Sequence, residues 1–244
     1  MPTRWIIDFA EMPLEEASKY EEAMMIVRTR VKPDRDLNAD AGFKSKWWLF
    51  GRSRPEMRAA LNGLEKYAAV GRHGKRMGIA WVEQWTMASD ATNVFAFDDD
   101  YSMGILLSRV HDAWAWARSS TLKGDLRYTP TTAFMTFPWP DPVTPAQRDA
   151  VAAASIALYK RRSALCLEHN ISLTALYNLM DDGAFTDLAA LHRLLDEAVA
   201  AAYGWPKAVA QDAGEIVARL TKLNREITEG TRDYVPFTVG GELV

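Results

Sequence analysis

The chain changes character at one proline-rich stretch, "TAFMTFPWPDPVTP", which spans residues 132 to 145. Each proline fixes its own φ angle and pushes the preceding residue into an extended conformation, so neither a regular helix nor a central strand can run through the stretch. Phe137 and Trp139 alternate with these prolines, and buried aromatic side chains can hold such a turn in place. The stretch therefore predicts a stiff boundary between two structural units.

Before this boundary the sequence mixes strand and helix patterns. Short runs of β-branched and aromatic residues predict strands over residues 4–9 and 93–100. Helical spacing predicts helices over residues 13–31, 54–67 and 101–120. Turn-forming residues without a sustained period predict a loop over 32–48, and 122–137 is expected to be extended. We expect a mixed α/β domain over residues 1–137.

After the boundary the patterns are helical throughout. Thr144, Pro145 and Gln147 form the sequence of a capping box with proline at the first helical position. Helical spacing predicts helices over residues 144–169, 172–182, 187–205 and 213–227. We therefore expect an all-α domain over residues 138–244, and the fold class of the whole chain is α+β.

Charge is distributed unevenly along the chain. Nine basic residues between positions 44 and 76 face two acidic ones, a net of plus seven, whereas ten basic residues from position 136 onward face fourteen acidic ones. A solvated surface is one interpretation of the basic run. The alternative is a face that binds a polyanion, which the aromatic residues within the run favour: Trp47, Trp48, Phe50 and Tyr67.

The sequence offers little independent catalytic chemistry. Its four histidines have no metal-ligand spacing, and its glycines form no nucleotide-binding motif. Three consecutive acids, Asp98 to Asp100, are interpreted as a helix-capping turn rather than a cation site. His192 and Asp196 stand four residues apart, which predicts a local helix contact rather than a catalytic dyad. We therefore expect no catalytic residues and no metal site.

Two further observations concern the surroundings of the chain. Cys166 is the only cysteine, so no internal disulfide can form, which suits a reducing cytoplasm. No apolar stretch approaches the roughly 20 residues of a membrane span. We expect a cytoplasmic protein without a membrane partner.

One short segment carries residues suited to recognition. If residues 121–127 form a strand, its period of two places Lys123, Asp125 and Arg127 on one face. Lysine and arginine donate to guanine edges, and a carboxylate accepts from the amine of cytosine, so this row could read DNA bases. The alternative is a strand edge that charged residues protect from aggregation.

A series of motifs in fixed order resembles the C-terminal part of MmeI-like DNA adenine methyltransferases, which combine methylation and sequence specificity in one chain. The resemblance extends from about residue 4 to about residue 228, and its motifs are "RWIIDF" with "EEASKY", "WWLFGRSRPEMRAAL", "FAFDDDYSMGILLSRVHDAWAWARSSTLKGDLRYTPTTAFMTFPWP", "LTALYN" and "LHRLLDEAVAAAYGW". In that family the N-terminal portion binds S-adenosylmethionine and carries an Asn-Pro-Pro-Tyr-type motif. No asparagine here is followed by two prolines.

The resemblance implies that the chain holds a target-recognition domain and a helical spacer, without a cofactor of its own. S-adenosylmethionine would belong to the complete enzyme, and the partners would be double-stranded DNA and a methyltransferase catalytic domain or subunit. The segment Ser119 to Tyr128 is similar to the family's recognition stretch, so Lys123, Asp125 and Arg127 become the expected base readers. Phosphate contacts are expected from the basic run: Lys44, Lys46, Arg52, Arg54, Arg72, Lys75 and Arg76.

The resemblance assigns packing roles elsewhere. Ser108 and His111 match a family pattern that we interpret as packing, and the helical motifs place Leu176, Tyr177, Tyr203 and Trp205 in the core. Two other functions stay open. The chain could be a stand-alone DNA-binding specificity or regulatory protein without methyltransferase activity, or a helical interaction protein whose basic run is ordinary surface.

Overall fold

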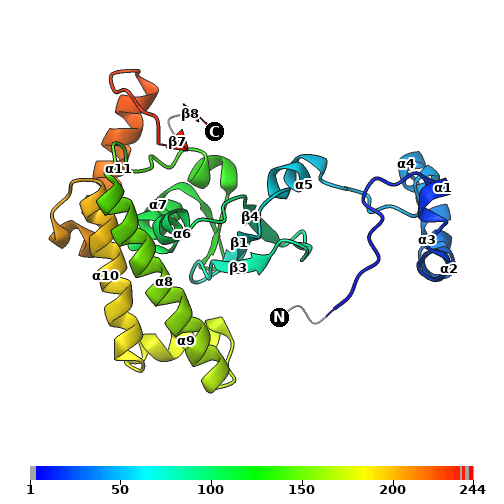
Figure 1. Cartoon of the computed structure of the whole chain (residues 1–244), viewed down its shortest axis with the longest axis horizontal. Helices are drawn as coiled ribbons and strands as arrows, with labels where there is room; N and C mark the ends of the chain where they lie inside the picture. Colours follow the sequence, from blue (N-terminus) through cyan, green and yellow to red (C-terminus); the bar gives the residue numbers. More distant parts are fainter. Residues whose placement is uncertain (1–3, 237, 240–241, 244) are drawn as a thin grey trace. The chain divides into compact units, whose positions relative to one another are not determined.

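The computed structural model describes residues 4–236, 238–239 and 242–243. The chain forms two compact units, which we call unit 1, Met1–Asn62, and unit 2, Gly63–Val244. Figure 1 shows unit 1 in blue to cyan and unit 2 from cyan to red. The first division of the chain by packing thus falls after residue 62.

The described part of unit 1 contains five short helices: α1 (Leu14–Ala17), α2 (Glu21–Arg30), α3 (Lys32–Asp36), α4 (Ala41–Ser45) and α5 (Pro55–Leu61). The strand predicted over residues 4–9 is wrong, because the described part of unit 1 holds no other strand with which it could pair. The helix predicted over 13–31 is interrupted after Ala17, where the Ser18 hydroxyl donates to the carbonyl of Leu14 at 2.7 Å.

The loop predicted over residues 32–48 is also corrected, since α3 and α4 lie within it. Both helices begin with a favourable terminal residue. Pro33 stands in the first turn of α3, where proline loses no hydrogen bond. Asp40 is the N-cap of α4, and its carboxylate accepts from the backbone N–H of Gly42 at 2.7 Å.

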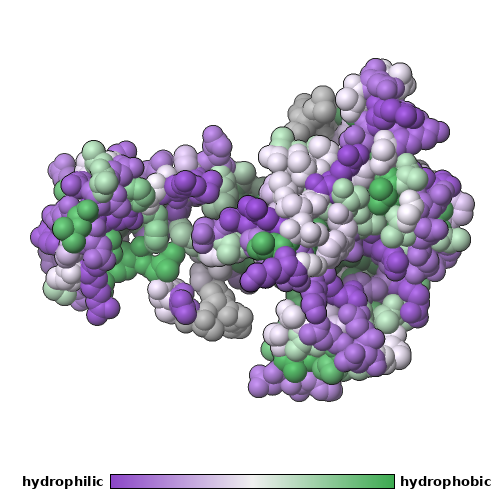
Figure 2. Space-filling view, turned by 180° about the vertical axis from the view of Figure 1, so that it is seen from behind, coloured by the Kyte–Doolittle hydropathy of each residue, from purple (hydrophilic) through white to green (hydrophobic). Residues whose placement is uncertain are grey.

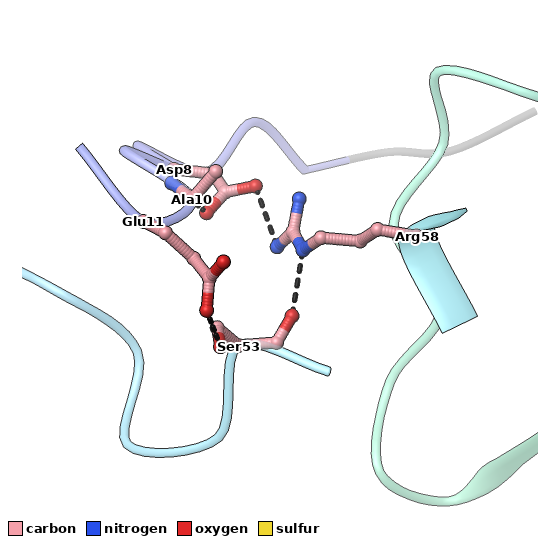
Figure 3. A network of polar contacts seen from close by, with 5 residues as sticks. All are labelled: Asp8, Ala10, Glu11, Ser53 and Arg58. Carbon is pink, nitrogen blue, oxygen red and sulfur yellow. Dashed lines mark hydrogen bonds and ion pairs between the residues drawn. The ribbon is translucent and has the colours of Figure 1, made fainter. Parts of the chain in front are cut away.

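A small apolar core and one polar network hold unit 1 together. Among the described residues, its buried core consists of Phe9, Ala17, Met24, Val27 and Trp47. Figure 3 shows the network that ties the irregular N-terminal segment to the segment before α5. Arg58 bonds both the Asp8 carboxylate at 2.9 Å and the carbonyl of Ser53 at 2.6 Å. The Ser53 hydroxyl in turn donates to Glu11 at 3.0 Å.

Unit 1 also exposes several large apolar side chains, which are Trp5, Ile6, Leu14, Tyr20, Met25, Ile26, Leu37 and Phe50. In Figure 2 hydrophobic residues form small patches among hydrophilic ones on the visible face of both units. A unit of this size has too little volume to cover every apolar side chain.

Unit 2 contains two three-stranded antiparallel sheets. The first has the order β3-β1-β4, from Ala80–Glu83, Lys66–Gly71 and Thr92–Phe95. The second has the order β2-β6-β5, from His73–Gly74, Asp125–Arg127 and Ser120–Leu122. A further short pair joins β7 (Thr238–Val239) and β8 (Glu242–Leu243). The strand predicted over 93–100 is confirmed only over residues 93–95, by β4. The helix predicted over 54–67 ends at Leu61 and gives way to β1.

Helices α6 (Asp100–Leu107) and α7 (Arg109–Arg118) replace the single helix predicted over 101–120. The chain bends at Ser108, whose hydroxyl accepts from the backbone of His111 at 3.4 Å and caps α7. Asp99 caps α6 by accepting from the backbone of Ser102 at 2.8 Å. The capping interpretation of the three consecutive acids is therefore confirmed.

The four helices predicted after the proline-rich stretch are confirmed by α8 (Pro145–Glu168), α9 (Leu173–Asp181), α10 (Thr186–Ala202) and α11 (Ala213–Thr228), and a 3-10 turn lies at Lys207–Gln211. The capping box at Thr144 and Gln147 forms as expected. Figure 1 shows α8 and α10 running side by side. With two small sheets and these helices, the fold class is α+β. No helix in the described residues is long and apolar enough to cross a membrane.

The proline-rich stretch is held from several sides. Its first three residues lie in a π-helical turn, Pro130–Phe134, so the extended conformation predicted over 122–137 is wrong there. The Ala133 carbonyl of this turn accepts from the Trp114 indole at 3.0 Å. Three further bonds reach it from the helical region and the C-terminal segment: Asn224 to the carbonyl of Thr136 at 2.7 Å, the Tyr203 hydroxyl to that of Pro138 at 2.8 Å, and the backbone of Trp139 to the Tyr234 hydroxyl at 2.6 Å. Phe137 and Trp139 are each 3% exposed. The stretch is thus a stiff, buried connection.

One apolar core extends across this connection, from Ala68 through Trp139 to Leu220. Residues on both sides of position 137 therefore pack together within unit 2. The predicted boundary between a domain over 1–137 and one over 138–244 stays a prediction. It differs from the boundary after residue 62, which follows from packing.

Candidate nucleic-acid interface

Residues 120–127 form a β-hairpin, so the prediction of one continuous strand is wrong. Strands β5 and β6 pair antiparallel, and Lys123 and Gly124 form the two-residue turn between them with φ angles of 53° and 87°. Positive φ at both central residues defines the turn type that matches the twist of a hairpin. Gly124 accepts this conformation without strain. Lys123 therefore lies at the tip of the hairpin, and not in a row with Asp125 and Arg127.

Asp125 and Arg127 do share one face of β6, as their spacing predicts. The register places His73 of β2 and Ser120 of β5 directly opposite Arg127, and Leu122 opposite Asp125. Residues opposite each other in antiparallel strands point to the same side. We call this side the outer face, made of His73, Ser120, Leu122, Asp125 and Arg127. Except for the half-buried Asp125, all of these residues are exposed.

The opposite side of the hairpin is fixed in the core of unit 2. Leu126 and Tyr128 are each 2% exposed. The Tyr128 hydroxyl bonds Nε2 of His111 at 3.2 Å, while Nδ1 of His111 lies 3.1 Å from the carbonyl of Leu106. Burial of this imidazole lowers the pKa of His111 to about 4, so the ring is neutral at pH 7. The packing role expected for Ser108 and His111 is confirmed, since both are fully buried.

The expected phosphate-binding residues fall into both units. Lys44, Lys46, Arg52 and Arg54 belong to unit 1, and each is exposed. Arg72, Lys75 and Arg76 belong to unit 2, next to or within the segment that leaves β2. The basic run of the sequence is therefore divided between unit 1 and unit 2.

These cations differ in their present partners. Arg76 forms an ion pair with Asp181, and Arg72 donates to the carbonyl of Asp90. Within the described residues, Lys75 and the four cations of unit 1 have no acidic partner within ion-pair distance. Arg58, which also belongs to the basic run, is occupied by Asp8. The unpaired cations can attract a polyanion at little cost.

Most aromatic residues of the basic run have structural roles, which corrects the expectation of an aromatic face. Trp47 is buried in the core of unit 1, and the indole of Trp48 donates to the carbonyl of Met12 at 2.9 Å. Tyr67 is 1% exposed and donates to the carbonyl of Thr86 at 2.7 Å. Phe50 is exposed. Three of these four aromatic residues therefore serve packing inside unit 1 or unit 2.

His192 and Asp196 do not contact each other as predicted. The imidazole of His192 bonds the Tyr177 hydroxyl at 3.1 Å, and the carboxylate of Asp196 accepts from the backbone of Arg109 at 2.7 Å. Each side chain finds a partner on another helix, because both face the packed interior. Burial raises the pKa of Asp196 to about 7 and lowers that of His192 to about 4. The core positions expected for Leu176 and Tyr177 are confirmed, and Tyr203 and Trp205 stack at 4.3 Å against the core.

The described residues contain no group of three or more His, Cys, Asp or Glu side chains arranged to hold a metal ion. What the outer face offers is a set of hydrogen-bonding groups on a fixed frame. The guanidinium of Arg127 is a two-pronged donor, the carboxylate of Asp125 is an acceptor, and Lys123 adds a mobile ammonium at the turn. Groups of these types match the donors and acceptors on the edges of DNA bases.

A solved structure has a fold similar to that of this chain. The chain is similar in structure to the Type IIL restriction-modification enzyme MmeI, solved in complex with DNA, with a TM-score of 0.73 at 21% sequence identity. The match covers 92% of this chain and 29% of that one. At this identity the likeness shows the fold alone.

The chain belongs to the family described as "MmeI, target recognition domain", whose model matches residues 3–141. It is also 29% identical over 153 residues to DNA methyltransferase A of Bacillus subtilis (strain 168), which covers 63% of this chain and 16% of that protein. The chain thus spans less than a third of either relative. The family match ends within the proline-rich stretch.

Proposed function

We propose that this chain is the DNA sequence-recognition module of a site-specific adenine-N6 DNA methyltransferase of a restriction-modification or phage-defence system. The observation that carries the proposal is the hairpin of a target-recognition family, with Asp125 and Arg127 on its outer face and Leu126 and Tyr128 fixed in the core. A base-reading side chain must be held within a fraction of an ångström, and a strand packed on a core achieves this better than a loop.

Asp125, Arg127 and Lys123 would read base edges in the major groove. Lys44, Lys46, Arg52, Arg54, Arg72, Lys75 and Arg76 would contact phosphates and position the module without reading sequence. For Arg72 and Arg76 this requires exchanging an internal partner for a phosphate. The exposed, unpaired cations need no such exchange.

Catalysis would come from a methyltransferase domain or subunit that binds S-adenosylmethionine. An adenine must leave the duplex to reach the methyl donor, so the recognition module would grip the flanking bases and backbone meanwhile. Cys166 is a free thiol, which fits work in the reducing cytoplasm.

Duplex DNA binding of the 244-residue protein tests the proposal. Fluorescence anisotropy with a duplex library of randomised centre should show an affinity that falls steeply as salt rises, because phosphate contacts release counterions. Selection from the same library should enrich one sequence. Binding that is insensitive to salt, or absent at low salt, contradicts the proposal.

The alternative is a stand-alone DNA-binding specificity or regulatory protein. Supplying a methyltransferase catalytic domain of the same family, with S-adenosylmethionine, separates the two. Methylation at the sequence that this chain selects supports the recognition module, whereas selective binding that never directs methylation supports the alternative.

A further inference from the structure

The edge strand β2 is held in its sheet by few backbone pairs. It pairs with β6 through only two residues, His73 and Gly74. Its N-terminal side is held well, since the backbone of Arg72 donates to Ala91 at 2.8 Å and its carbonyl accepts from Tyr128 at 3.0 Å. The C-terminal side continues into residues 75–79, which we call the β2–β3 loop. The position of His73 beside Arg127 therefore depends on what fixes this loop.

Helices beyond the proline-rich stretch make the contacts that fix the loop. Arg162 of α8 donates to the carbonyl of Ile79 at 2.6 Å and to the Tyr177 hydroxyl at 3.4 Å. Gly78 lies against Leu173 of α9, since a side chain there would come within 3.1 Å of the Leu173 methyl group. Arg76 reaches Asp181 and lies over the Tyr177 ring at 5.5 Å. The loop is thus held by α8 and α9 at three of its five residues, Arg76, Gly78 and Ile79.

Arg162 is an unusual residue to use for structure alone. It is 4% exposed, and no carboxylate among the described residues lies within ion-pair distance. Burying a guanidinium without a counter-charge is costly, and an apolar residue of similar size would stabilise a core at least as well. What arginine adds at this position is a fixed, branched donor that reaches the backbone of Ile79 from another segment.

We infer that Arg162 is a positioning residue of the outer face: by holding Ile79 it fixes the β2–β3 loop, and so keeps His73 in register beside Arg127 and Lys75 at the interface. The helical region then contributes to sequence recognition without touching DNA. This inference rests on the proposed function, because it assigns Arg162 to the same site.

The test compares three variants of the full 244-residue chain with the wild type. Arg162→Met removes the donor at similar length, Arg162→Lys keeps one donor for Ile79, and Arg161→Met changes the neighbouring arginine, which instead pairs with Asp187 on the surface. Two properties are measured: hydrogen exchange of the Gly78 amide, which donates to Arg76 within the loop at 3.0 Å, and discrimination between the duplex selected by the wild type and a scrambled duplex.

Arg162→Met should speed exchange of the Gly78 amide at least tenfold and reduce discrimination at least fivefold. Arg162→Lys should recover most of both, and Arg161→Met should match the wild type. If Arg162→Met does not fold, Tyr177→Phe removes one partner of the guanidinium and should shift both readouts in the same direction by less.

The contradicting results can be told apart. A lower unfolding temperature of Arg162→Met, with exchange and discrimination of the folded protein unchanged, makes Arg162 merely structural and overturns the inference alone. Failure of the wild type to bind any duplex overturns the proposed function instead, and the exchange measurement still shows whether Arg162 holds the loop.

Discussion

The two units bring cations to the surface in different ways. In unit 1, Lys44, Lys46, Arg52 and Arg54 are carried by short helices and turns around a small core. In unit 2, Arg127 lies on a strand whose neighbours Leu126 and Tyr128 are buried in a much larger core. Phosphates can be met by mobile charges, whereas a base edge demands fixed geometry. Under the proposed function, unit 1 would add affinity alone, whereas unit 2 would supply the sequence choice together with phosphate contacts of its own.

The largest expected effect concerns the cores themselves. Trp114 is fully buried and bonds Ala133, so Trp114→Ala should lower the free energy of unfolding of unit 2 by about 3–5 kcal/mol. Trp47→Ala should instead unfold unit 1 while unit 2 keeps its transition. Calorimetry and hydrogen exchange follow both units. A single shared transition that both variants lower equally would contradict two separate cores.

Acidification should affect unit 2 through its buried imidazoles, since all four histidines lie there. Burial, with Arg162 and Arg76 nearby, lowers the pKa of His192 to about 4 from 6.5. A depressed histidine pKa means that stability is lost as pH falls through 6.5 toward 4, because the unfolded chain binds the proton more readily. Relative to His192→Gln, the wild type should lose about 2–3 kcal/mol over this range.

Chemical denaturation at a series of pH values measures this difference. His169→Gln, at an exposed position, controls for losing an imidazole at the surface. A constant difference between wild type and His192→Gln across the range would show that His192 is protonated freely in the folded state.

Arg127→Ala should relax sequence choice in unit 2. Removing a bidentate hydrogen bond to a base costs about 1–3 kcal/mol for the preferred duplex and nothing for a scrambled one. Competition binding with the two duplexes measures the ratio. Equal weakening of both duplexes would place Arg127 among the residues that bind phosphate.

Lys46→Ala and Arg54→Ala in unit 1 should have the smallest effects. Each should weaken all duplexes alike, and should reduce the slope of log affinity against log salt by about 0.9, because one phosphate is no longer neutralised by the protein. Binding isotherms at several salt concentrations give this slope. An unchanged slope would remove that residue from the proposed phosphate set.

Much of the helical region could be predicted from the sequence, because its signals are local. The capping box at Thr144 and the helical spacing over 187–205 each depend on residues within a few turns. The proline-rich stretch was equally predictable, since proline restricts the backbone whatever surrounds it. These features need no knowledge of distant partners.

The rest depends on contacts that the sequence does not display. The run at 4–9 has the composition of a strand but no partner strand among the described residues of unit 1, and His192 and Asp196 have the spacing of a pair but face different helices. The hairpin was not predicted because Lys123–Gly124 is a weak turn signal compared with asparagine–glycine. His73 lies on the outer face because β2 pairs with β6 in a register that sets it opposite Arg127, and the sequence does not show this pairing.

The central claim is that unit 2 chooses the sequence while unit 1 adds affinity, and one selection experiment tests it most directly. Wild type, Arg127→Ala and Arg54→Ala are each incubated with the randomised duplex library, and the bound sequences are determined. Arg54→Ala should enrich the wild-type sequence from less bound DNA, whereas Arg127→Ala should lose preference at one or two positions. An unchanged preference in Arg127→Ala, or an altered one in Arg54→Ala, would contradict the claim.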